Sequence, residues 1–564
     1  MLSLKNLLFT SAILLLYILA MNHILGLNGV YPRSHDTSAC IVKVESGGAE
    51  ILANAEEERF GDRDKRAFDK LPLNSTRFCL EQAALRPGDI DIVTWGWDAE
   101  KLSSDKVLPP EYPISITRRI ETVKVPHHEA HAASVFYTSP FDKAAILVVD
   151  GQGEKESTTI WKGSRESGLE KVLSIGVDRS LGYLYGAISR FCGLGSFGAG
   201  KVMGLAPYGI PHYLDVLEEV YNGLRLPEQE GHDSQVEFFK QFISGLEVRG
   251  FKSADVAYVF DKSSGKTRPE PFIDTVHRDM AASVQAYLEQ QMLQLANKAH
   301  AITGLDNLCL AGGVAMNCVT NSVIQDSGPF KEIFLQPGCE DNGVAMGAAL
   351  AVAKLPAPFE TPYLGPSFSD EEISTALDRL GVNYTTHDNI ESVTAELLAI
   401  GSVVGWFQGG LEFGPRALGG RSIIAHPGTL AMKNLVNSVK QREQWRPFGP
   451  SVLADHADEL FDHAYPSPYM LRSFKVREEW RERMPAVVHV DGTTRPQTVT
   501  PEAHPRYHGM IKAFELLTGI PAVLNTSFNN YDEPLVATPL DALKTFASSR
   551  LQALVLGNNL VQKR

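Results

Sequence analysis

The sequence predicts an α/β protein of two domains, and three observations carry that prediction. The chain has 564 residues, which is too long for a single hydrophobic core. Short apolar runs typical of strands alternate with segments of helical periodicity, as in α/β folds. A proline-rich break at residues 355–367 separates a first domain, 23–354, from a second domain, 368–564.

The elements of the first domain follow from length and periodicity. Strands are expected where short apolar runs occur, at 24–28, 92–97 and 145–149. Helices are expected where apolar residues recur at helical spacing, at 74–84, 128–137, 280–302 and 344–353. The stretch 205–275 is polar, and we predict an irregular insertion at the surface.

The break and the second domain follow from proline content and periodicity. Four prolines within 355–367 cannot belong to one regular element, so we interpret this segment as a linker. The smaller α/β domain after it is expected to begin with a helix at 370–380 and a strand at 402–408. We find no internal sequence repeat and no low-complexity tract.

The first 22 residues form an apolar N-terminal segment that needs a separate interpretation. Residues 7–21 are almost uninterruptedly apolar, but they are short for a membrane span, which needs about 20 residues. No convincing cleavage site follows, which weakens the alternative of a signal peptide. Because a strand is expected immediately after Met21, we interpret Met21 as the true start of the protein. A membrane anchor stays open as the alternative.

Composition and charge narrow the classes of function. The hydrophobic share of 44% and the charged share of 21% are ordinary for a soluble protein. A net charge of -14 disfavours tight nucleic-acid binding, which usually requires a basic surface, but it permits a local anion site. Six scattered cysteines without a CxxC pair indicate reduced thiols in a cytoplasmic enzyme, without disulfides or a zinc site.

Two histidines and two aspartates are candidate ligands for a metal centre. His127 and His131 are four residues apart at a predicted helix start, so they share one helix face. Asp150 ends a buried apolar strand, and Asp341 lies in a loop that leads into a helix. Two imidazoles with two carboxylates favour octahedral Fe, Mn or Mg over tetrahedral zinc. On spacing alone, a structural role for the histidine pair is the favoured alternative.

The neighbouring residues exclude a zincin motif. An HExxH pattern that begins at His128 would need a histidine where the chain has Ala132. His128 could replace His127 as a ligand, but it points to a different helix face from His131.

Three glycine-rich loops predict a nucleotide site near these ligands. Glycine lets backbone N–H groups approach a phosphate, especially at a helix start. Neither a P-loop nor a Rossmann fingerprint occurs, and tight turns explain most glycines, so each loop alone is weak evidence. The candidate nucleotide-binding residues are Gly151, Gln152, Gly153, Lys201, Gly312, Gly313 and Asn317.

The second domain concentrates basic residues beside glycine, proline and aromatic residues. Guanidinium groups match phosphate oxygens in a bidentate way, and lysine supplies a mobile charge, so this cluster predicts an anion site. The alternative is that these side chains are solvated surface charges. The candidates are Arg416, Lys440, Arg446, Arg495 and Arg506, with Asn525, Ser527 and Asn529 as short polar donors.

Several long motifs follow one another in an order that resembles a known family. They are LGLNG ahead of His35 and Asp36, EEER at 56–59, HHEAHAAS, VVDGQGE, GKVMGLAPYG and AGGVAMNC. Together they resemble the O-carbamoyltransferases, which include nodulation protein U and the tobramycin and cephamycin carbamoyltransferases. The resemblance runs from about residue 23 to the C-terminus.

The resemblance implies a fold and a set of cofactors. It implies an actin-like ATPase (ASKHA) first domain, similar to the tRNA threonylcarbamoylation protein, and a YrdC-like second domain. The four candidate ligands match the family's metal positions, which usually hold Fe²⁺, with Mn²⁺ or Mg²⁺ as alternatives. The motifs GPRALG, RPF and NTSFN of the second domain resemble a site for carbamoyl phosphate and ATP.

The implied reaction has two steps. In the second domain, carbamoyl phosphate and ATP (with Mg²⁺) give carbamoyl adenylate and pyrophosphate. In the first domain, a hydroxyl of a small-molecule or saccharide acceptor attacks the carbamoyl carbon and AMP departs, with the metal and Asp150 acting at the reacting group. His35 with Asp36 is the candidate for deprotonating the acceptor, and Asn28 with His35 for binding it. A purely structural turn is the alternative role for His35.

Two other functions stay open. One is a tRNA threonylcarbamoyladenosine-type modification enzyme, and the other is an ATP-binding protein of the actin-like fold without carbamoyl transfer. The acidic composition counts against the first, and the arginine cluster of the second domain counts against the second. We expect no nucleic-acid partner and no stable membrane insertion, whereas a homodimer, the metal and the acceptor stay open.

Overall fold

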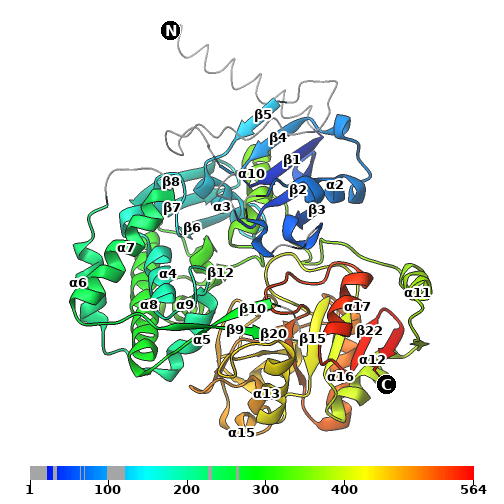
Figure 1. Ribbon diagram of the computed structural model, residues 1–564. Coiled ribbons are helices and arrows are strands. Elements are labelled where there is room, and N and C mark those ends of the chain that lie inside the picture. The colour runs from blue at the N-terminus through cyan, green and yellow to red at the C-terminus, as the bar shows by residue number, and fades with distance from the viewer. Residues whose placement is uncertain are drawn as a thin grey trace.

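The computed structural model describes residues 22–29, 35–61, 63, 65–68, 70–97, 121–226, 232–261 and 266–563. The apolar segment 7–21 and the start proposed at Met21 lie outside these ranges. Figure 1 shows an N-terminal part in blue to green above a C-terminal part in yellow to red. Within the described ranges, no helix is both long and apolar enough to cross a membrane.

The first domain contains two five-stranded sheets of the same plan. The first sheet has the order β3-β2-β1-β4-β5 and consists of β1 (His23–Asn28), β2 (Ser38–Glu45), β3 (Gly48–Glu56), β4 (Ile92–Trp95) and β5 (Glu121–Lys124). The second has the order β8-β7-β6-β11-β12 and consists of β6 (Lys143–Val149), β7 (Glu156–Ser164), β8 (Gly168–Gly176), β11 (Asn307–Ala311) and β12 (Glu332–Phe334). In each sheet, three antiparallel strands are followed by two strands parallel to the first of them. The topology therefore repeats although the sequence does not.

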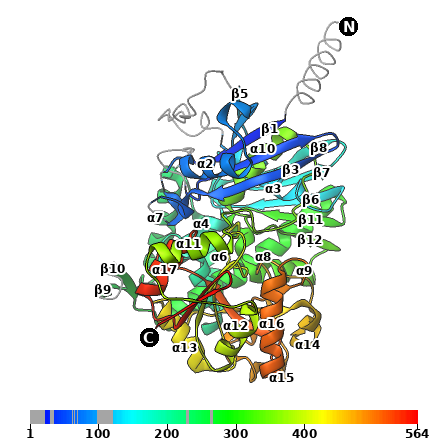
Figure 2. The same ribbon diagram turned by 90° about the vertical axis from the view of Figure 1, so that its right-hand side faces the viewer.

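Two buried helices, α3 (His127–Phe136) and α10 (Val344–Ala353), pack against each other between these sheets (Figure 2). Helix α10 contacts β1 and β2, whereas α3 contacts β6 and β11. Their close approach requires glycine, because a Cβ on Gly347 of α10 would overlap the backbone carbonyl of Ala130 in α3. This packing brings the histidines of α3 next to the loop that precedes α10 and holds Asp341.

Further helices cover the outer faces of the sheets. They are α2 (Leu73–Gln82) on the first sheet, and α4 (Leu181–Phe191), α5 (Ala199–Leu205), α8 (Thr275–Thr303) and α9 (Cys318–Ser327) around the second. Helix α8 begins earlier than predicted because Asp274 caps it by accepting a hydrogen bond from His277 N–H. Strand β4 ends at Trp95, two residues before the predicted end, which leaves Trp97 in the loop. The other strands and helices predicted for this domain are confirmed within a few residues.

The prediction that residues 205–275 form an irregular insertion is wrong. The stretch contains α6 (Leu214–Gly223), α7 (His232–Val248) and an antiparallel hairpin of β9 (Val256–Asp261) and β10 (Lys266–Pro271). Phe238, Phe239 and Phe242 of α7 are buried in the same core as α4 and α8. Helical spacing of a few aromatic residues outweighs the polar composition of the segment.

The second domain is built on an eight-stranded mixed sheet. Residues 355–367, all of them described, contain no helix or strand, as their prolines predict. The sheet order is β13 (Thr385–Thr386), β23 (Asn559–Gln562), β22 (Ala553–Leu556), β14 (Val404–Phe407), β15 (Arg421–Ala425), β21 (Ala522–Ser527), β16 (Gly449–Leu453) and β20 (Gln497–Val499). The main helices are α11 (Asp370–Arg379), α12 (Ile390–Ala399), α13 (Leu430–Val439), α16 (Pro505–Thr518) and α17 (Pro539–Ser548). A small sheet of β17 (Phe461–Asp462), β18 (Phe474–Val476) and β19 (Thr493–Thr494) lies with the short helices α14 (Ala457–Leu460) and α15 (Glu478–Arg481).

The six cysteines are free and buried, in agreement with the prediction of reduced thiols. Burial raises the pKa values of the thiols of Cys40 and Cys339 above their ordinary range. These thiols therefore pack as small apolar groups of the core.

Candidate metal centre and anion site

Four buried side chains converge at the start of α3. They belong to His127, His131, Asp150 and Asp341, and one potential ligand atom of each lies within 4.8 Å of the others. The Nε2 atoms of the two histidines are 3.1 Å apart. His127 Nε2 lies 3.3 Å from Asp150 Oδ2, and His131 Nε2 lies 3.3 Å from Asp341 Oδ1. The structure thus brings together the four residues proposed as metal ligands from the sequence.

Local structure explains this convergence. The carboxylate of Glu154 accepts hydrogen bonds of 2.9 and 3.1 Å from the His127 N–H, which caps the first turn of α3. Strand β6 ends just before Asp150, whose Oδ1 accepts a 2.9 Å hydrogen bond from Gly313 N–H. Gly312 has a φ of +89°, and a Cβ there would overlap the end of β6. The glycine pair therefore serves to fix Asp150.

The hydrogen bonding of His127 fits a metal site. His127 Nδ1 lies 3.2 Å from the carbonyl oxygen of Gly96, so we assign the ring proton to Nδ1. The Nε2 lone pair then faces the Asp150 carboxylate and the His131 ring. A lone pair directed at a carboxylate oxygen is repelled unless a proton or a cation lies between them. The indole of Trp97 stacks on His127 with ring centroids 3.7 Å apart, which fixes the ring plane.

The electrostatics of the centre also favour a cation. Burial alone would lower the pKa of His127, but the carboxylates of Asp341 and Asp150 outweigh burial and raise it to about 10. Burial would raise the pKa of Asp150, yet the two imidazoles hold it well below its ordinary range. These shifts mean that the carboxylates draw protons onto the imidazoles when no metal is bound. A divalent metal ion would displace those protons, and its charge would balance the two ionised carboxylates beside two neutral imidazoles.

His35 lies at the edge of this centre, with its side chain one third exposed. Its Nδ1 is 2.8 Å from Asp36 Oδ2 and 3.7 Å from Asp341 Oδ2. Arg66 Nη1 donates a 2.8 Å hydrogen bond to the same Asp36 oxygen. Asp36 has a φ of +52°, a strained backbone conformation for a residue other than glycine. His35 is therefore held by a charged network that reaches a proposed metal ligand.

Asn28 joins the two loops that carry Asp36 and Asp341. Its Nδ2 donates hydrogen bonds to the backbone carbonyls of Asp36 at 3.2 Å and Asp341 at 2.9 Å. Its Oδ1 accepts a 3.1 Å hydrogen bond from Trp97 Nε1. These bonds direct its amide to the protein rather than to a ligand, so the contacts indicate that Asn28 positions the centre.

The predicted nucleotide-binding residues fall into two groups. Gly151, Gly153, Gly312 and Gly313 flank Asp150 as proposed, and Gln152 accepts a hydrogen bond from the Tyr183 hydroxyl. By contrast, Asn317 caps α9 and exchanges hydrogen bonds with Gln285. Lys201 Nζ forms a 3.2 Å ion pair with Glu443 of the second domain. Asn317 and Lys201 thus have structural partners in this state.

A basic cluster in the second domain contains most of the residues predicted for the anion site. Lys440 is buried, and its Nζ donates 2.6 Å hydrogen bonds to the backbone carbonyls of Ser527 and Asn529 as well as one to the Asn529 side chain. Burial lowers the pKa of Lys440 well below its ordinary range, and the nearby Arg442 and Arg446 lower it further. The proximity of like charges is costly unless an anion binds among them.

Two arginines of this cluster are incompletely paired. In the described part of the chain, the buried Nε atoms of Arg416 and Arg495 have no hydrogen-bond partner. Burial lowers the pKa of Arg495, and the neighbouring Arg416 and Arg446 lower it further. Guanidinium groups stay charged in proteins, so these unpaired donors indicate a place for phosphate oxygens.

The structure does not bring every predicted anion ligand into this cluster. Arg506 Nε forms a 2.6 Å ion pair with Glu391, and its other nitrogens donate to the side chains of Gln408 and Asn558. It therefore ties α16 to α12 and to the end of the sheet. Asn525 Nδ2 donates to the Ala417 carbonyl at 3.0 Å, which secures the turn after Arg416.

The first domain contributes residues that the sequence analysis missed. Lys65 lies in the 3₁₀ turn η2 (Lys65–Ala67), and its charge affects the pKa of Lys440. Glu340, next to Asp341, is influenced by both Arg66 and Arg416, and burial together with Asp36 raises its pKa to about 7. The sequence signal for these contacts was the basic pair Lys65-Arg66, which follows the EEER motif. Only the fold brings that turn close to the second domain.

A buried bridge connects the two sites. Glu56 Oε1 accepts a 2.7 Å hydrogen bond from Gly414 N–H, and Arg59 Nη2 donates a 3.0 Å hydrogen bond to the Gly414 carbonyl. Arg59 Nε also lies 3.3 Å from Glu56 Oε2, and both residues are 3% exposed. Gly414 has a φ of +88°, and a Cβ there would overlap the Pro337 carbonyl. The EEER motif thus fastens the loop of Arg416 to the loop that leads to Asp341.

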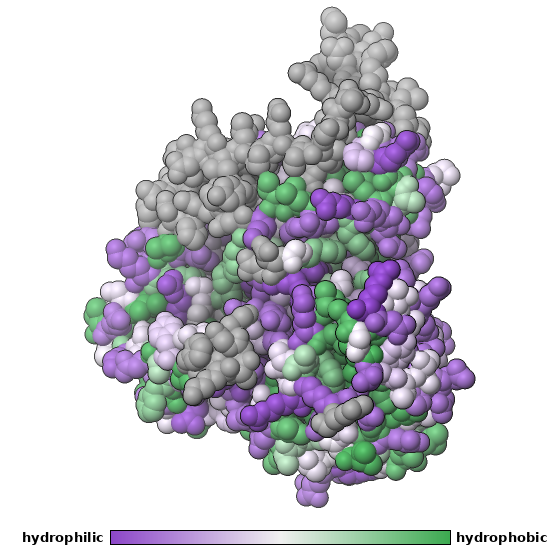
Figure 3. Space-filling view, turned by 45° about the vertical axis from the view of Figure 1, so that its right-hand side comes forward, coloured by the Kyte–Doolittle hydropathy of each residue, from purple (hydrophilic) through white to green (hydrophobic). Residues whose placement is uncertain are grey.

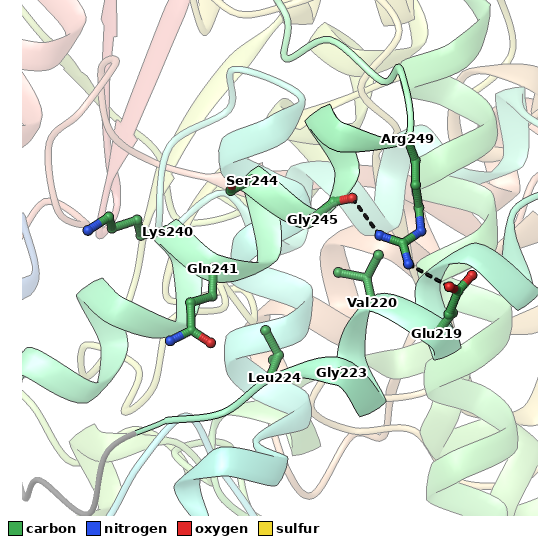
Figure 4. Close-up of a pocket in the computed structure, with 9 residues that line it drawn as sticks. All are labelled: Glu219, Val220, Gly223, Leu224, Lys240, Gln241, Ser244, Gly245 and Arg249. Carbon is green, nitrogen blue, oxygen red and sulfur yellow. Dashed lines mark hydrogen bonds and ion pairs between the residues drawn. The ribbon is translucent and has the colours of Figure 1, made fainter.

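A surface cavity of about 450 Å³ lies elsewhere, on α6 and α7 (Figure 4). Arg249 at its edge donates to the Gly245 carbonyl and pairs with Glu219 at 2.6 Å. None of the proposed site residues lines this cavity. On the face seen in Figure 3, hydrophobic residues form small groups among hydrophilic ones.

Comparison with known proteins assigns both parts of the chain. A family model described as Carbamoyltransferase N-terminus matches residues 114–350, and one described as Carbamoyltransferase C-terminus matches residues 395–563. Uncharacterized protein sll1178 of Synechocystis sp. is 36% identical over 96% of this chain and 97% of its own length. Nodulation protein NolNO of Sinorhizobium fredii is 35% identical over 94% of this chain and 79% of its own length. Full-length HypF in the phosphate- and nucleotide-bound form is similar at a TM-score of 0.31 and 15% identity, over 59% of this chain and 56% of HypF.

These matches define an enzyme of the transferase class. The chain belongs to the carbamoyltransferase family, which confirms the family predicted from the motifs.

Proposed function

We propose that this protein is an ATP-dependent O-carbamoyltransferase that makes carbamoyl adenylate in its second domain and transfers the carbamoyl group to a hydroxyl in its first. The observation that carries this proposal is the pairing of a cation-attracting centre with an anion-attracting cluster across one domain interface. The repeated sheet plan of residues 23–354 supports an actin-like fold. We assign residues 368–564 to a YrdC-like domain on the motifs that surround Arg416 and Asn525.

The first step is proposed to occur among Arg416, Lys440, Arg446 and Arg495. Carbamoyl adenylate contains the carbamoyl group of carbamoyl phosphate but not its phosphate. Water must therefore first hydrolyse carbamoyl phosphate to carbamate and inorganic phosphate. The resulting carbamate oxygen attacks the α-phosphorus of ATP, the bond to the β-phosphate breaks, and pyrophosphate leaves. The unpaired guanidinium donors would stabilise negative charge on the phosphate oxygens as these bonds break. Arg506 is not needed for this step, because Glu391 already pairs with it.

The second step is proposed to occur beside His35. The acceptor oxygen attacks the carbamoyl carbon, the bond between that carbon and the adenylate oxygen breaks, and AMP leaves with the electron pair. His35, oriented by Asp36, would accept the hydroxyl proton. A divalent metal held by the four ligands, Fe²⁺ or alternatively Mn²⁺ or Mg²⁺, would supply Lewis acidity at the carbamoyl group.

The proximity of the two sites supports transfer inside the protein. Glu340 on the metal loop is influenced by Arg416 of the second domain. A mixed anhydride such as carbamoyl adenylate hydrolyses in water, so a short path between buried sites would protect it. The use of ATP and carbamoyl phosphate, together with six reduced cysteines, supports a cytoplasmic location.

The proposal is tested with the full-length, metal-loaded protein and without any acceptor. Carbamoyl phosphate and ATP are supplied, and pyrophosphate and carbamoyl adenylate are followed by phosphorus NMR and mass spectrometry. We expect both products, and neither when carbamoyl phosphate is omitted. Folded protein that forms neither product from the complete mixture would refute the mechanism. When acceptors are then added to the same mixture, carbamoylation of tRNA but of no small hydroxyl compound would favour the tRNA-modifying alternative.

A further inference from the structure

Three rings meet at the outer edge of the metal centre. They belong to His35, Phe68 and Phe197, which come from three separate segments of the first domain. The ring centroids of Phe68 and Phe197 are 5.0 Å apart, and His35 lies 5.1 Å from Phe197 and 6.0 Å from Phe68. His35 Nδ1 is 3.7 Å from Asp341 Oδ2. The group therefore borders the place where the acceptor hydroxyl must arrive.

The two phenylalanines are unusually accessible for clustered rings. Phe68 is 39% exposed and Phe197 is 47% exposed. By contrast, Phe238 and Phe239, which also contact each other, are buried in the core of the same domain. Single exposed apolar residues are common, whereas adjoining ones at a catalytic centre are typical of a binding site.

The groups around these rings are charged or polar. The Arg66 guanidinium lies 4.8 Å from the centre of the Phe197 ring and pairs with Asp36. Asp36 in turn contacts His35. An occupant must therefore offer an apolar face to the rings and hydrogen-bonding groups around that face. An entirely apolar ligand would leave Arg66 and Asp36 without new partners as it covered them, at a cost in desolvation.

We propose that Phe68 and Phe197 form an acceptor subsite that stacks on the C–H face of a neutral pyranose ring. A pyranose combines a flat C–H face with hydroxyl groups at its edge, which matches rings bordered by Arg66, Asp36 and His35. An open-chain polyol offers the same hydroxyl groups but lacks the flat C–H face of the ring. A cationic amino sugar would bring its charge towards Arg66, which already occupies the cation position over Phe197. This assignment rests on the proposed function, because it takes the hydroxyl beside His35 as the nucleophile.

Binding is measured on the metal-loaded, full-length protein by saturation-transfer NMR with methyl β-D-glucopyranoside, D-glucitol and tobramycin as probes at millimolar concentration. We expect transfer to the pyranoside, strongest at its ring C–H protons, and little to glucitol. Phe68→Leu and Phe197→Ala should each weaken pyranoside binding roughly tenfold, because leucine keeps apolar area but lacks a ring face. Phe197→Tyr, which keeps an aromatic ring at this position, should bind the pyranoside like wild type. Phe272→Ala is the matched control, since Phe272 is 73% exposed outside this group.

The subsite is refuted if the pyranoside does not bind, if glucitol or tobramycin binds as well as the pyranoside, or if the Phe68 and Phe197 variants bind like wild type. Thermal melting verifies that each variant is folded. Pyrophosphate formation from carbamoyl phosphate and ATP is measured on the same variants and should stay unchanged. If the wild-type protein forms no pyrophosphate, the proposed function is refuted. If it forms pyrophosphate but does not bind the pyranoside, only the subsite is refuted.

Discussion

The metal centre and the basic cluster are both buried, but they are charged in opposite ways. In the metal centre, Asp150 and Asp341 each face an imidazole, and together they attract a cation. In the basic cluster, burial lowers the pKa values of Lys440 and Arg495, and neighbouring arginines lower them further. Burial raises the energetic cost of each imbalance, so each site is prepared for a ligand of opposite charge. The difference suggests which half of the reaction belongs to which domain.

Removal of a metal ligand should separate the two half-reactions most clearly. We expect His131→Ala to reduce carbamoylated product about 100-fold or more, because an open ligand position weakens metal binding. Pyrophosphate formation without acceptor should remain near wild type. Product is measured by mass spectrometry and pyrophosphate by a coupled assay.

His128→Gln provides the control for that variant. His128 lies on the same helix turn and is buried, but its Nδ1 contacts Thr159 at 3.0 Å rather than an acidic ligand. The His128→Gln variant should therefore retain metal binding. Equal loss of metal from both variants would contradict the proposed ligand set.

Removal of a cation from the second domain should have the reverse effect. Arg416→Ala should lower pyrophosphate formation about 100-fold, because a charged donor to the reacting phosphates is lost. Metal affinity, measured by isothermal titration, should not change. Arg506→Ala is the matched control and should leave the KM for ATP unchanged, since Arg506 is paired with Glu391. A large rise in that KM would place Arg506 in the site after all.

Metal loading should stabilise the folded state by several degrees in a thermal melt. A ligand present at 100 times its Kd stabilises by about 2.7 kcal/mol. We expect Fe²⁺ or Mn²⁺ to raise the melting temperature, chelation to reverse this, and His131→Ala to abolish it. Stabilisation by Zn²⁺ alone would instead indicate tetrahedral coordination.

Disruption of the bridge between the sites should have the smallest effect on either half-reaction. Glu56→Gln keeps an acceptor for Gly414 N–H but removes the charge beside Arg59, at a cost of about 1–3 kcal/mol in unfolding free energy. We expect each step to proceed, with fewer carbamoyl groups transferred per pyrophosphate released. Glu57→Gln, in the same motif, is the control because Glu57 bonds to Ser75 instead. An unchanged ratio in Glu56→Gln would show that the bridge has no part in transfer.

Sequence reasoning succeeded where chemistry and spacing are local. The four-residue spacing of His127 and His131 places both rings on one helix face in any helix. The position of Asp150 at a strand end has the same origin. The prediction failed for residues 205–275, because a few buried phenylalanines determined the helices there and the polar average concealed them.

Long-range partners account for the other differences. Arg506 resembles Arg416 in sequence context, but Glu391, distant along the chain, pairs with Arg506, whereas Arg416 keeps a buried donor unpaired. Asn317, a predicted nucleotide ligand, exchanges hydrogen bonds with Gln285, 32 residues away in the sequence. Lys65 belongs to the first domain, yet its charge acts on Lys440. Such differences depend on which charges meet after folding.

The sequence by itself determined most of the α/β elements and the family, because these depend on local periodicity and on the chemistry of short motifs. Only the tertiary structure decided which basic residues keep unpaired donors, how EEER joins the two sites, and which rings border His35. Those features arise from contacts between segments far apart in the chain, whose electrostatic and packing energies exist only once both domains have folded.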